Sequence, residues 1–347
     1  MRYSSANRFV CMAAVGLAMG LGAVDAWAKG EKTVIDYDNF SKPGGYTIVD
    51  YSMKWANVYG LGEMASTGGD TRSFAGGKFS LSAVPFTVGY DFSVFDHLKY
   101  IAVSTQVFVP PVRGSITFSS VIQAQTPGTQ PGRVIRGTYV QSGAPYAQPT
   151  LEGQQAGAVM NMIDFGTGQL FDWFISGSKA FTLIERLPSS VTGNAAPGQP
   201  GYVGRDKMYT QIIDEVSIGP GPHHVSITFT RSGRNGEKGS VAYHLNGRLV
   251  SKVKNVGVPL DVQGRPYSGI YPSIGPGEPV ARMVSGFAIG HGLFSLLDAF
   301  PFQHPEAAEL AVSIPVANRL FGQGAKASFA DFRVVIETKD VDDDEDD

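Results

Sequence analysis

Apolar and polar residues alternate along short segments of this chain, and turn-forming residues separate these segments. The octapeptide HVSITFTR, residues 224–231, places Val225, Ile227 and Phe229 on one side and hydroxyl side chains between them. This period of two is that of a strand with one buried face, whereas an amphipathic helix repeats its apolar positions every three to four residues. No long stretch keeps a helical period. The chain is therefore predicted to consist of strands, with short helices confined to loops such as Phe294–Phe300.

Residues 240–253 contain the clearest hairpin signal. The dipeptide Asn246-Gly247 lies between SVAYHL and RLVSKV, and it suits a type I′ turn, which requires positive φ at both central residues. Further segments with strand character are Tyr46–Ser52, Lys78–Val84, Tyr100–Phe108, Gly114–Val121, Gln169–Ile175, Lys179–Arg186, Tyr209–Ile218, Phe287–His291, Leu310–Val316 and Ser328–Ile336.

The composition indicates one large all-β domain with long loops. The 347 residues include 43 Gly and 21 Pro, and only 17% are charged, so that turn formers interrupt the apolar segments far more often than in helical proteins. Gly/Pro-rich stretches at 126–150, 190–204 and 261–280 are the expected long loops, the usual carriers of function on a rigid sandwich. We predict a two-sheet antiparallel β-sandwich, a jelly roll, over residues 29–339.

The first 28 residues have the pattern of a signal peptide. Arg2 and Arg8 precede the apolar stretch Phe9–Val24, and Ala26-Trp27-Ala28 supplies small residues at the positions that a signal peptidase reads. The apolar stretch is shorter than the roughly 20 residues that span a bilayer. We therefore expect cleavage after Ala28, a secreted or periplasmic protein and no membrane span in the mature chain.

The remaining charged and sulfur-containing residues limit cofactors and partners. Cys11 is the only cysteine and lies in the signal, so the mature chain has no disulfide and no thiolate metal site. A formal net charge of −3 excludes the basic surface that nucleic acid requires. The tail from Asp340, residues 340–347, is expected to be disordered, with calcium chelation as the alternative. No cofactor is expected beyond such a structural calcium.

Four segments resemble a known superfamily. MIDFGTG (162–168), FDWFISGSKAFTLIERLP, PGPHHVSITFTRS and SVAYHLNGRLVSKV together resemble the concanavalin A-like lectin and glucanase jelly rolls. In that superfamily a Trp-His or similar pair opens a strand leading into a hairpin with an Asp/Asn-Gly turn. Here His223-His224 and Tyr243-x-Leu245-Asn246-Gly247 stand in those places.

The mature chain further resembles a family of secreted microbial proteins of this fold that has no known activity, through FAIGHGLFSLLDAFPFQHP and RLFGQGAKASFADF. The superfamily resemblance implies carbohydrate recognition or glycoside hydrolysis. The same fold also hosts adhesion and structural modules.

Residues 169–186 offer a carboxylate pair. If Gly177-Ser178 is a two-residue II′ turn, the expected partners are Ser176 with Lys179, Phe174 with Phe181, Asp172 with Leu183 and Leu170 with Glu185. Asp172 and Glu185 then share a face as diagonal neighbours, and their carboxyl groups could approach the roughly 5–5.5 Å of a retaining glycosidase pair. Apolar surroundings would raise the pKa of one carboxyl. In the alternative, Glu185 pairs with an arginine and Asp172 caps a turn, since the glucanase signature Glu-x-Asp-x-x-Glu is absent.

A second group of polar residues lies within GHGLFSLLDAFPFQH. His291, Asp298 and His304 could bind a divalent metal or act as acid and base. Their spacing matches no known metal motif, so we expect no metal. If the protein is an enzyme, we expect His291 as a third catalytic residue, with Asp298 and His304 contacting the ligand at one end of a cleft. The alternative is an ordinary hydrogen-bond network.

Aromatic residues near the long loops are candidates for stacking on sugar rings. Trp173, Tyr139, Tyr146 and Tyr271 are the residues that we select, because a ring face binds the apolar C–H surface of a sugar. Their alternative role is packing in the core.

Together these features predict an exported jelly roll that binds a glycan or similar extended ligand on its concave sheet. Whether it is an enzyme stays open: a glycoside hydrolase, a non-catalytic carbohydrate-binding or structural envelope protein, and a lyase or isomerase for an apolar substrate are the three candidates. Phe and Met on the concave face would favour the third.

Overall fold

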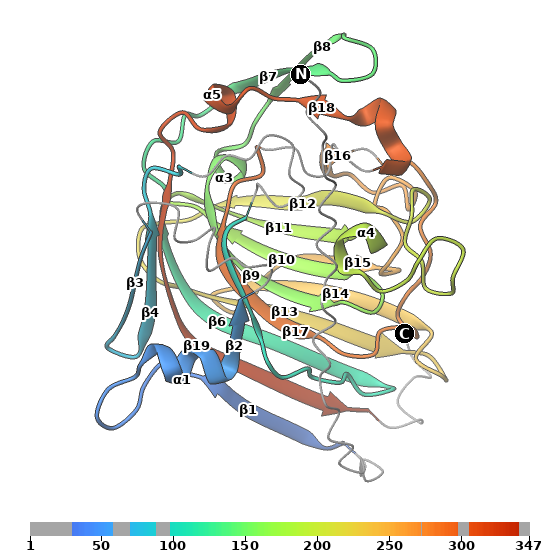
Figure 1. The fold of residues 1–347 in the computed structure, drawn as a ribbon. Helices are drawn as coiled ribbons and strands as arrows, with labels where there is room; N and C mark the ends of the chain where they lie inside the picture. The colour runs from blue at the N-terminus through green and yellow to red at the C-terminus, as the bar shows by residue number, and fades with distance from the viewer. Residues whose placement is uncertain (1–29, 58–69, 88–97, 272, 298–304, 340–347) are drawn as a thin grey trace, which may run out of the picture.

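The computed structural model describes residues 30–57, 70–87, 98–271, 273–297 and 305–339. Two antiparallel sheets of eight strands each pack face to face, and a small third sheet lies at one end (Figure 1). This arrangement confirms the predicted all-β sandwich of the jelly-roll type. The predicted signal peptide, residues 1–28, and acidic tail, residues 340–347, lie outside the described residues.

Seven strands of sheet 1 pair one after another, and the eighth strand, β1, pairs with residues 332–337 of β19. In spatial order its strands are β15 (Arg248–Lys254), β14 (Lys238–Leu245), β13 (His223–Ser232), β6 (Gly114–Gln125), β19 (Ala325–Thr338), β4 (Lys78–Ala83) and β3 (Asp70–Ala75), with β1 (Lys32–Asp38).

Sheet 2 faces sheet 1 across the core. In spatial order its strands are β16 (Ser268–Tyr271), β12 (Tyr209–Ser217), β11 (Lys179–Arg186), β10 (Gln169–Ile175), β9 (Gly157–Asp164), β17 (Ala288–Phe294), β5 (Leu98–Ser104) and β2 (Trp55–Asn57). The small sheet is β18 (Val312–Ser313), β7 (Val134–Tyr139) and β8 (Pro145–Pro149). The described helices are short: α1 (Ile48–Lys54), α3 (Glu152–Gln155), α4 (Ser189–Thr192), α5 (Val316–Arg319) and the 3₁₀ helix η1 (Pro305–Leu310).

The hairpin of β14 and β15 forms as predicted. Asn246 and Gly247 have φ values of 51° and 80°, the two positive angles that a type I′ turn requires. On the neighbouring strand β13, Val225, Ile227 and Phe229 are fully buried against sheet 2. Alternation in the sequence thus identified the correct inward face of sheet 1.

Polar contacts connect the two sheets through the apolar core. The indole N–H of Trp173 on β10 donates to the carbonyl of Ser226 on β13 at 2.9 Å. The hydroxyl of Tyr243 on β14 donates to the carbonyl of Leu183 on β11 at 2.6 Å. Because both aromatic side chains are fully buried, these bonds satisfy donors that would otherwise cost free energy.

The strands β9, β10 and β11 are buried on both faces. We call the face of sheet 2 that is turned away from sheet 1 its far face. Helix α3 covers part of it so closely that a Cβ atom on Gly153 would lie 2.2 Å from the Phe181 ring. The backbone N–H of Leu296 donates to the carbonyl of Gln154 at 2.7 Å and holds the segment after β17 against the same helix. Central strands covered on both sides explain why GAVMNMID and QLFDWFI are mostly apolar and lack the regular alternation of β13.

Two sequence predictions are wrong at the level of single elements. Residues 46–52, predicted as a strand, contain the start of α1, because Thr47 and Asp50 form a capping box. The helix predicted at Phe294–Phe300 is absent from its described part, because Phe294 ends strand β17 and residues 295–297 are not helical. Of the predicted strand Leu310–Val316, only Val312–Ser313 pairs with a neighbour.

No helix within the described ranges is long and apolar enough to cross a membrane.

Candidate functional site

The hairpin of β10 and β11 has the predicted register. Leu170 pairs with Glu185, Asp172 with Leu183 and Phe174 with Phe181. The backbone N–H of Ser176 donates to the carbonyl of Lys179 across the turn. The predicted II′ type is wrong, because Gly177 does not have the positive φ that this type requires at its first central residue. Asp172 and Glu185 therefore lie on the same face as diagonal neighbours, and this face is the far face of sheet 2.

Two residues from the adjacent strands extend this pair into a polar row across four strands. On β9, Asn161 is the register partner of Asp172, and its side-chain amide donates to the Asp172 carboxyl. On β12, Thr210 is the register partner of Glu185, and its hydroxyl donates to Glu185 Oε2 at 3.1 Å. All four side chains are at most 4% exposed. We call Asn161, Asp172, Glu185 and Thr210 the polar row.

The two carboxyl groups of the polar row are in contact with each other, and the pKa of each is raised. Burial, followed by the adjacent Glu185, raises the pKa of Asp172 well above its usual range. Burial also raises the pKa of Glu185, to about 7, against the hydrogen bonds from Thr210 and Asp172 that lower it. Two carboxylates in contact in a low dielectric cannot both ionise without a large penalty. Burial therefore favours a state in which one of the two carboxyl groups keeps its proton.

The polar row is flanked by apolar side chains. On the same face of sheet 2, Val159, Phe174, Phe181, Leu183 and Ile212 form one buried cluster with Phe294 and Leu296. Ile163, Leu170, Leu187 and Ala288 form another cluster beyond the row. This desolvation is the main physical cause of the raised pKa values.

The ionic alternative for this pair does not fit the geometry. Neither Asp172 nor Glu185 forms an ion pair with any residue in the described ranges, and the neighbouring Arg186 pairs instead with Glu278 at 3.0 Å. The carboxyl groups are also closer than the roughly 5–5.5 Å of a retaining glycosidase, because they are in hydrogen-bond contact. The catalytic roles of both residues stay predictions.

The stability difference between the wild type and Glu185→Gln is expected to depend on pH. The unfolded chain releases the Glu185 proton near pH 4.5 and the folded protein only near pH 7, so the folded state binds more protons in this window and its stability falls as pH rises. Glutamine cannot ionise. Between pH 4.5 and about 7, the free energy of unfolding of Glu185→Gln should therefore rise by about 3 kcal/mol relative to that of the wild type. Unfolding in denaturant measures both values. A difference independent of pH would mean that Glu185 is already ionised in the folded protein.

His291 lies in the core and not beside the polar row, which corrects its predicted role. It is on β17, where the period of two directs it toward sheet 1, and it is fully buried among the rings of Trp55, Phe79 and Phe329. Its Nε2 is 2.9 Å from the Tyr51 hydroxyl, which contacts the Tyr100 hydroxyl at 2.8 Å. Burial lowers the pKa of His291 to about 3. The imidazole is neutral and packed between the sheets, so it does not line the face that carries Asp172 and Glu185.

The aromatic residues selected for sugar stacking are mostly packing residues. Trp173 is fully buried in the core between the sheets, which excludes it as a binding surface. Tyr139 and Tyr146 belong to the small sheet, where their rings meet edge to face at 5.7 Å and pack into an apolar cluster with Val312. Tyr271 ends β16 opposite Thr210. Burial of a Tyr or Trp cannot be read from a loop position in the sequence, because it depends on which distant element covers it.

Asp298 and His304 lie outside the described residues. Within the described ranges, no group of three or more His, Cys, Asp or Glu side chains is arranged to bind a metal ion.

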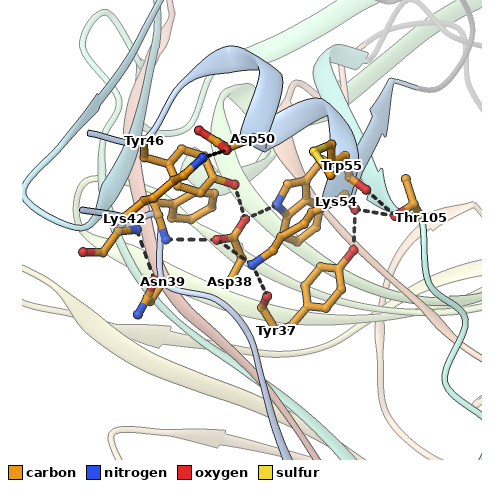
Figure 2. A network of polar contacts seen from close by, with 12 residues as sticks. Tyr37, Asp38, Asn39, Lys42, Tyr46, Asp50, Lys54, Trp55 and Thr105 are labelled. Carbon is orange, nitrogen blue, oxygen red and sulfur yellow. Dashed lines mark hydrogen bonds and ion pairs between the residues drawn. The ribbon is translucent and has the colours of Figure 1, made fainter. Parts of the chain in front are cut away.

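Sequence reasoning did not identify Asn161, Thr210 or the buried Asp38. Asn161 is a single amide within strand β9, GAVMNMID, whose other residues are apolar up to the final Asp164, and this isolation is the signal that could have found it. Asp38 ends strand β1 and is only 2% exposed. Figure 2 shows its carboxylate between the Tyr46 hydroxyl and the Trp55 indole, which donate to Oδ2 at 2.6 and 2.8 Å. This network ties the N-terminal segment to the sandwich.

Comparisons with known proteins give one family match and several structural similarities. The sequence model of one protein family, which is described as a family of unknown function, matches residues 70–338. No curated protein matches the sequence.

Three solved structures illustrate the fold similarity. An endo-1,3-β-glucanase from Streptomyces sioyaensis is 11% identical, with 90% of this chain and 98% of that chain covered and a TM-score of 0.41. An inactivated mutant β-agarase B in complex with agaro-octaose is 10% identical, with 91% and 97% covered and a TM-score of 0.43. A Bacillus licheniformis β-glucanase is 10% identical, with 91% and 100% covered and a TM-score of 0.34. At these identities the similarity does not extend to the residues of a site.

Proposed function

This chain belongs to a family of unknown function, DUF6081, and we propose its function from the residues of its own site. The proposed protein is an acid–base enzyme in which Asp172 is the acid and Glu185 is the base. A glycan is the substrate that we propose first. The observation that carries the proposal is the pair of buried carboxyl groups in contact on the far face of sheet 2, each with a raised pKa. A structural role alone would be served better by apolar side chains, since burying ionisable groups costs free energy. Strongly perturbed carboxyl pairs are typical of catalytic sites.

The contact between the carboxyl groups favours proton transfer over displacement. Retaining and inverting glycosidases separate their carboxyl groups by about 5–5.5 Å and 6.5–9.5 Å, so that a sugar or a water fits between them. In a β-elimination, by contrast, the base takes a proton from one carbon while the acid protonates the oxygen leaving the next carbon. The C–H electrons form the new double bond and the C–O bond breaks. The proton that is abstracted and the oxygen that leaves are bound to adjacent carbon atoms. An acid and a base that are in contact with each other can therefore reach both.

The same contact returns the pair to its starting state. After one elimination Glu185 holds the abstracted proton and Asp172 has lost its own. One proton passing from Glu185 to Asp172 across their hydrogen bond restores the acid and the base without solvent. Beside the pair, the Asn161 side-chain oxygen has no hydrogen-bond partner among the described residues, which leaves an acceptor for a ligand hydroxyl. We propose the glycan as substrate on the resemblance to concanavalin A-like jelly rolls, and export after cleavage at Ala28 on the N-terminal pattern.

A screen against polysaccharides tests this function. The protein starting at Lys29 is incubated with acidic and neutral polysaccharides, and new reducing ends and the ultraviolet absorbance of unsaturated products are followed together. We expect both signals to rise with the wild type, and Glu185→Gln and Asp172→Asn to reduce the rate by about 10²-fold or more, the usual contribution of a general acid or base. Asp164→Asn is the matched control, because Asp164 is a buried carboxyl on β9 whose partner is Thr167 and not the polar row.

The two signals separate the possible outcomes. New reducing ends without ultraviolet absorbance would mean that the enzyme hydrolyses the glycan and does not cleave it by elimination. Activity that survives both dyad variants would contradict the assignment of Asp172 and Glu185, and silence across the panel would reject the glycan.

A second candidate is an isomerase that shifts a proton within an apolar substrate. The apolar side chains on both sides of the polar row favour it, such as Phe174, Leu183 and Leu170. An enzyme of this kind exchanges substrate hydrogen for deuterium in heavy water. Exchange into apolar ketones, present with the wild type and lost in Glu185→Gln, would select this candidate over the glycan lyase.

A further inference from the structure

A groove lies on the opposite side of the molecule's core from the polar row, on the face of sheet 1 that is turned away from sheet 2. Its volume is about 310 Å³, and it runs over β3, β4, β19 and β6. The core-facing side chains of these strands, such as Phe79 and Phe329, are fully buried on the other side. The groove is therefore separated from the polar row by the whole core of the sandwich.

The pairing of the four strands arranges the groove side chains in two transverse rows. Ser73 pairs with Ser80, Ser80 with Ser328 and Ser328 with Gln123. Two residues along each strand, the second row contains Thr71, Ser82, Lys326 and Gln125 in the same order. Neighbouring side chains within a row are about 4.8 Å apart, which is the spacing of strands in a sheet.

The polar groups of these rows are not used by the protein's own structure. None of the eight side chains forms a side-chain hydrogen bond or an ion pair with another residue in the described part of the chain. Elsewhere on the same face this is different: the hydroxyls of Thr117 and Thr228 bond to each other at 2.8 Å. The groove thus presents free donors and acceptors at regular intervals, together with one cation, Lys326.

We propose that this groove is a second binding site, for a hydroxyl-rich glycan chain that carries an acidic group beside Lys326. A ladder of hydroxyl and amide groups matches a chain of sugar hydroxyls, and the repeat of a pyranose chain is similar to the strand spacing. A nucleic acid would require several cations along the groove, and Lys326 is the single one that lines it. An apolar ligand finds no partner, because Leu81 and Ala327 direct their side chains into the core.

The binding strength should come from hydrogen bonds and from the charge of Lys326, since no aromatic side chain lines the groove. Each such bond contributes modestly in water. The site is therefore suited to retain a polymer through many repeats, while the chemistry takes place at the polar row on the other sheet.

Electrophoresis of the native protein through gels containing a polysaccharide tests this site. The probes are polygalacturonate as the acidic glycan and a neutral β-glucan. We expect polygalacturonate to retard the wild type more strongly than the β-glucan does. The double variant Ser80→Val and Ser328→Val should lower the apparent affinity about tenfold or more, because it removes two central hydroxyls and narrows the groove. Lys326→Gln should lower it a few-fold for polygalacturonate only.

A matched double variant controls for the fold. Thr230→Val and Ser240→Val are paired residues on the same face of sheet 1, on β13 and β14 and away from the groove, and we expect them to migrate as the wild type does. Glu185→Gln should also be retarded normally, so a failure of the proposed activity leaves this test intact. Retardation that persists in the Ser80/Ser328 variant, or that is absent from the wild type, would overturn the site. Equal retardation by polygalacturonate and by the β-glucan would overturn the proposal that the ligand carries an acidic group beside Lys326.

Discussion

Acidification from pH 6.5 to 3 is expected to remove about 5 kcal/mol of stability from the wild type relative to His291→Gln. His291 has its pKa lowered to about 3 by complete burial, while the unfolded chain takes up the proton near 6.5. The unfolded state therefore binds more protons throughout this window, and the stability that depends on a neutral His291 is lost as pH falls. The measurement is the free energy of unfolding of both proteins in denaturant across this range.

The aromatic surroundings of His291 explain why the effect is large. Its Nδ1 has no hydrogen-bond partner among the described residues. The neighbouring rings of Trp55, Phe79 and Phe332 carry no negative charge that would stabilise a protonated imidazole. Tyr51→Phe is a suitable control, because it removes the bond to Nε2 but keeps the imidazole buried, so the pH dependence should persist. A stability difference that stays constant from pH 6.5 to 3 would mean that water reaches the imidazole.

Asp38→Ala is expected to destabilise the protein by about 3–5 kcal/mol, the usual cost of breaking a buried charged contact. The carboxylate accepts hydrogen bonds from the Trp55 indole at 2.8 Å, the Tyr46 hydroxyl at 2.6 Å and the Phe40 backbone at 3.0 Å. Lys54 lies 3.4 Å away and supplies the positive charge. Truncation leaves several buried donors without an acceptor. Denaturant unfolding of the purified variant measures the loss.

The same strand provides the control for Asp38. Asp36 bonds to Arg333 at 2.6 Å, but its side chain is 70% exposed, so Asp36→Ala should cost about 1 kcal/mol or less. Asp38→Asn keeps an acceptor oxygen and should lie between the two alanine variants. If Asp38→Ala were no worse than Asp36→Ala, the network in Figure 2 would not hold the N-terminal segment in place.

Local signals in the sequence were sufficient where the structure is local. The turn at Gly177-Ser178 fixes the register of a hairpin, and the placement of Asp172 and Glu185 on one face followed from it. The error at residues 46–52 was also local: alternation suggested a strand, but the hydrogen bonds between Thr47 and Asp50 begin a helix. A capping box outweighs alternation in a segment this short.

The remainder of the site depends on contacts between distant parts of the chain. Asn161 and Thr210 meet the carboxyl pair because β9 and β12 flank the hairpin, and strand order cannot be derived from periodicity. His291 was grouped with Asp298 and His304 by closeness in sequence. Along a strand, however, successive side chains alternate between faces, so His291 packs in the core while its neighbours Gly290 and Gly292 belong to the far face. Both faces of β9, β10 and β11 are buried, and their sequences alone do not reveal which one meets sheet 1.

Strand β19 has a consequence for how the chain is made. It contains residues 325–338, near the carboxyl end, yet it lies between β6 on one side and β4 and β1 on the other. Every other described strand of sheet 1 precedes it in the chain, so until β19 has been synthesised this sheet stays in three unjoined pieces: β6 with β13, β14 and β15, the pair β3–β4, and β1 alone. Pairings this distant in sequence form slowly, and the waiting edges of β6 and β4 are open to other chains. A chain cut short before Ala325 would therefore have an open seam through the middle of sheet 1.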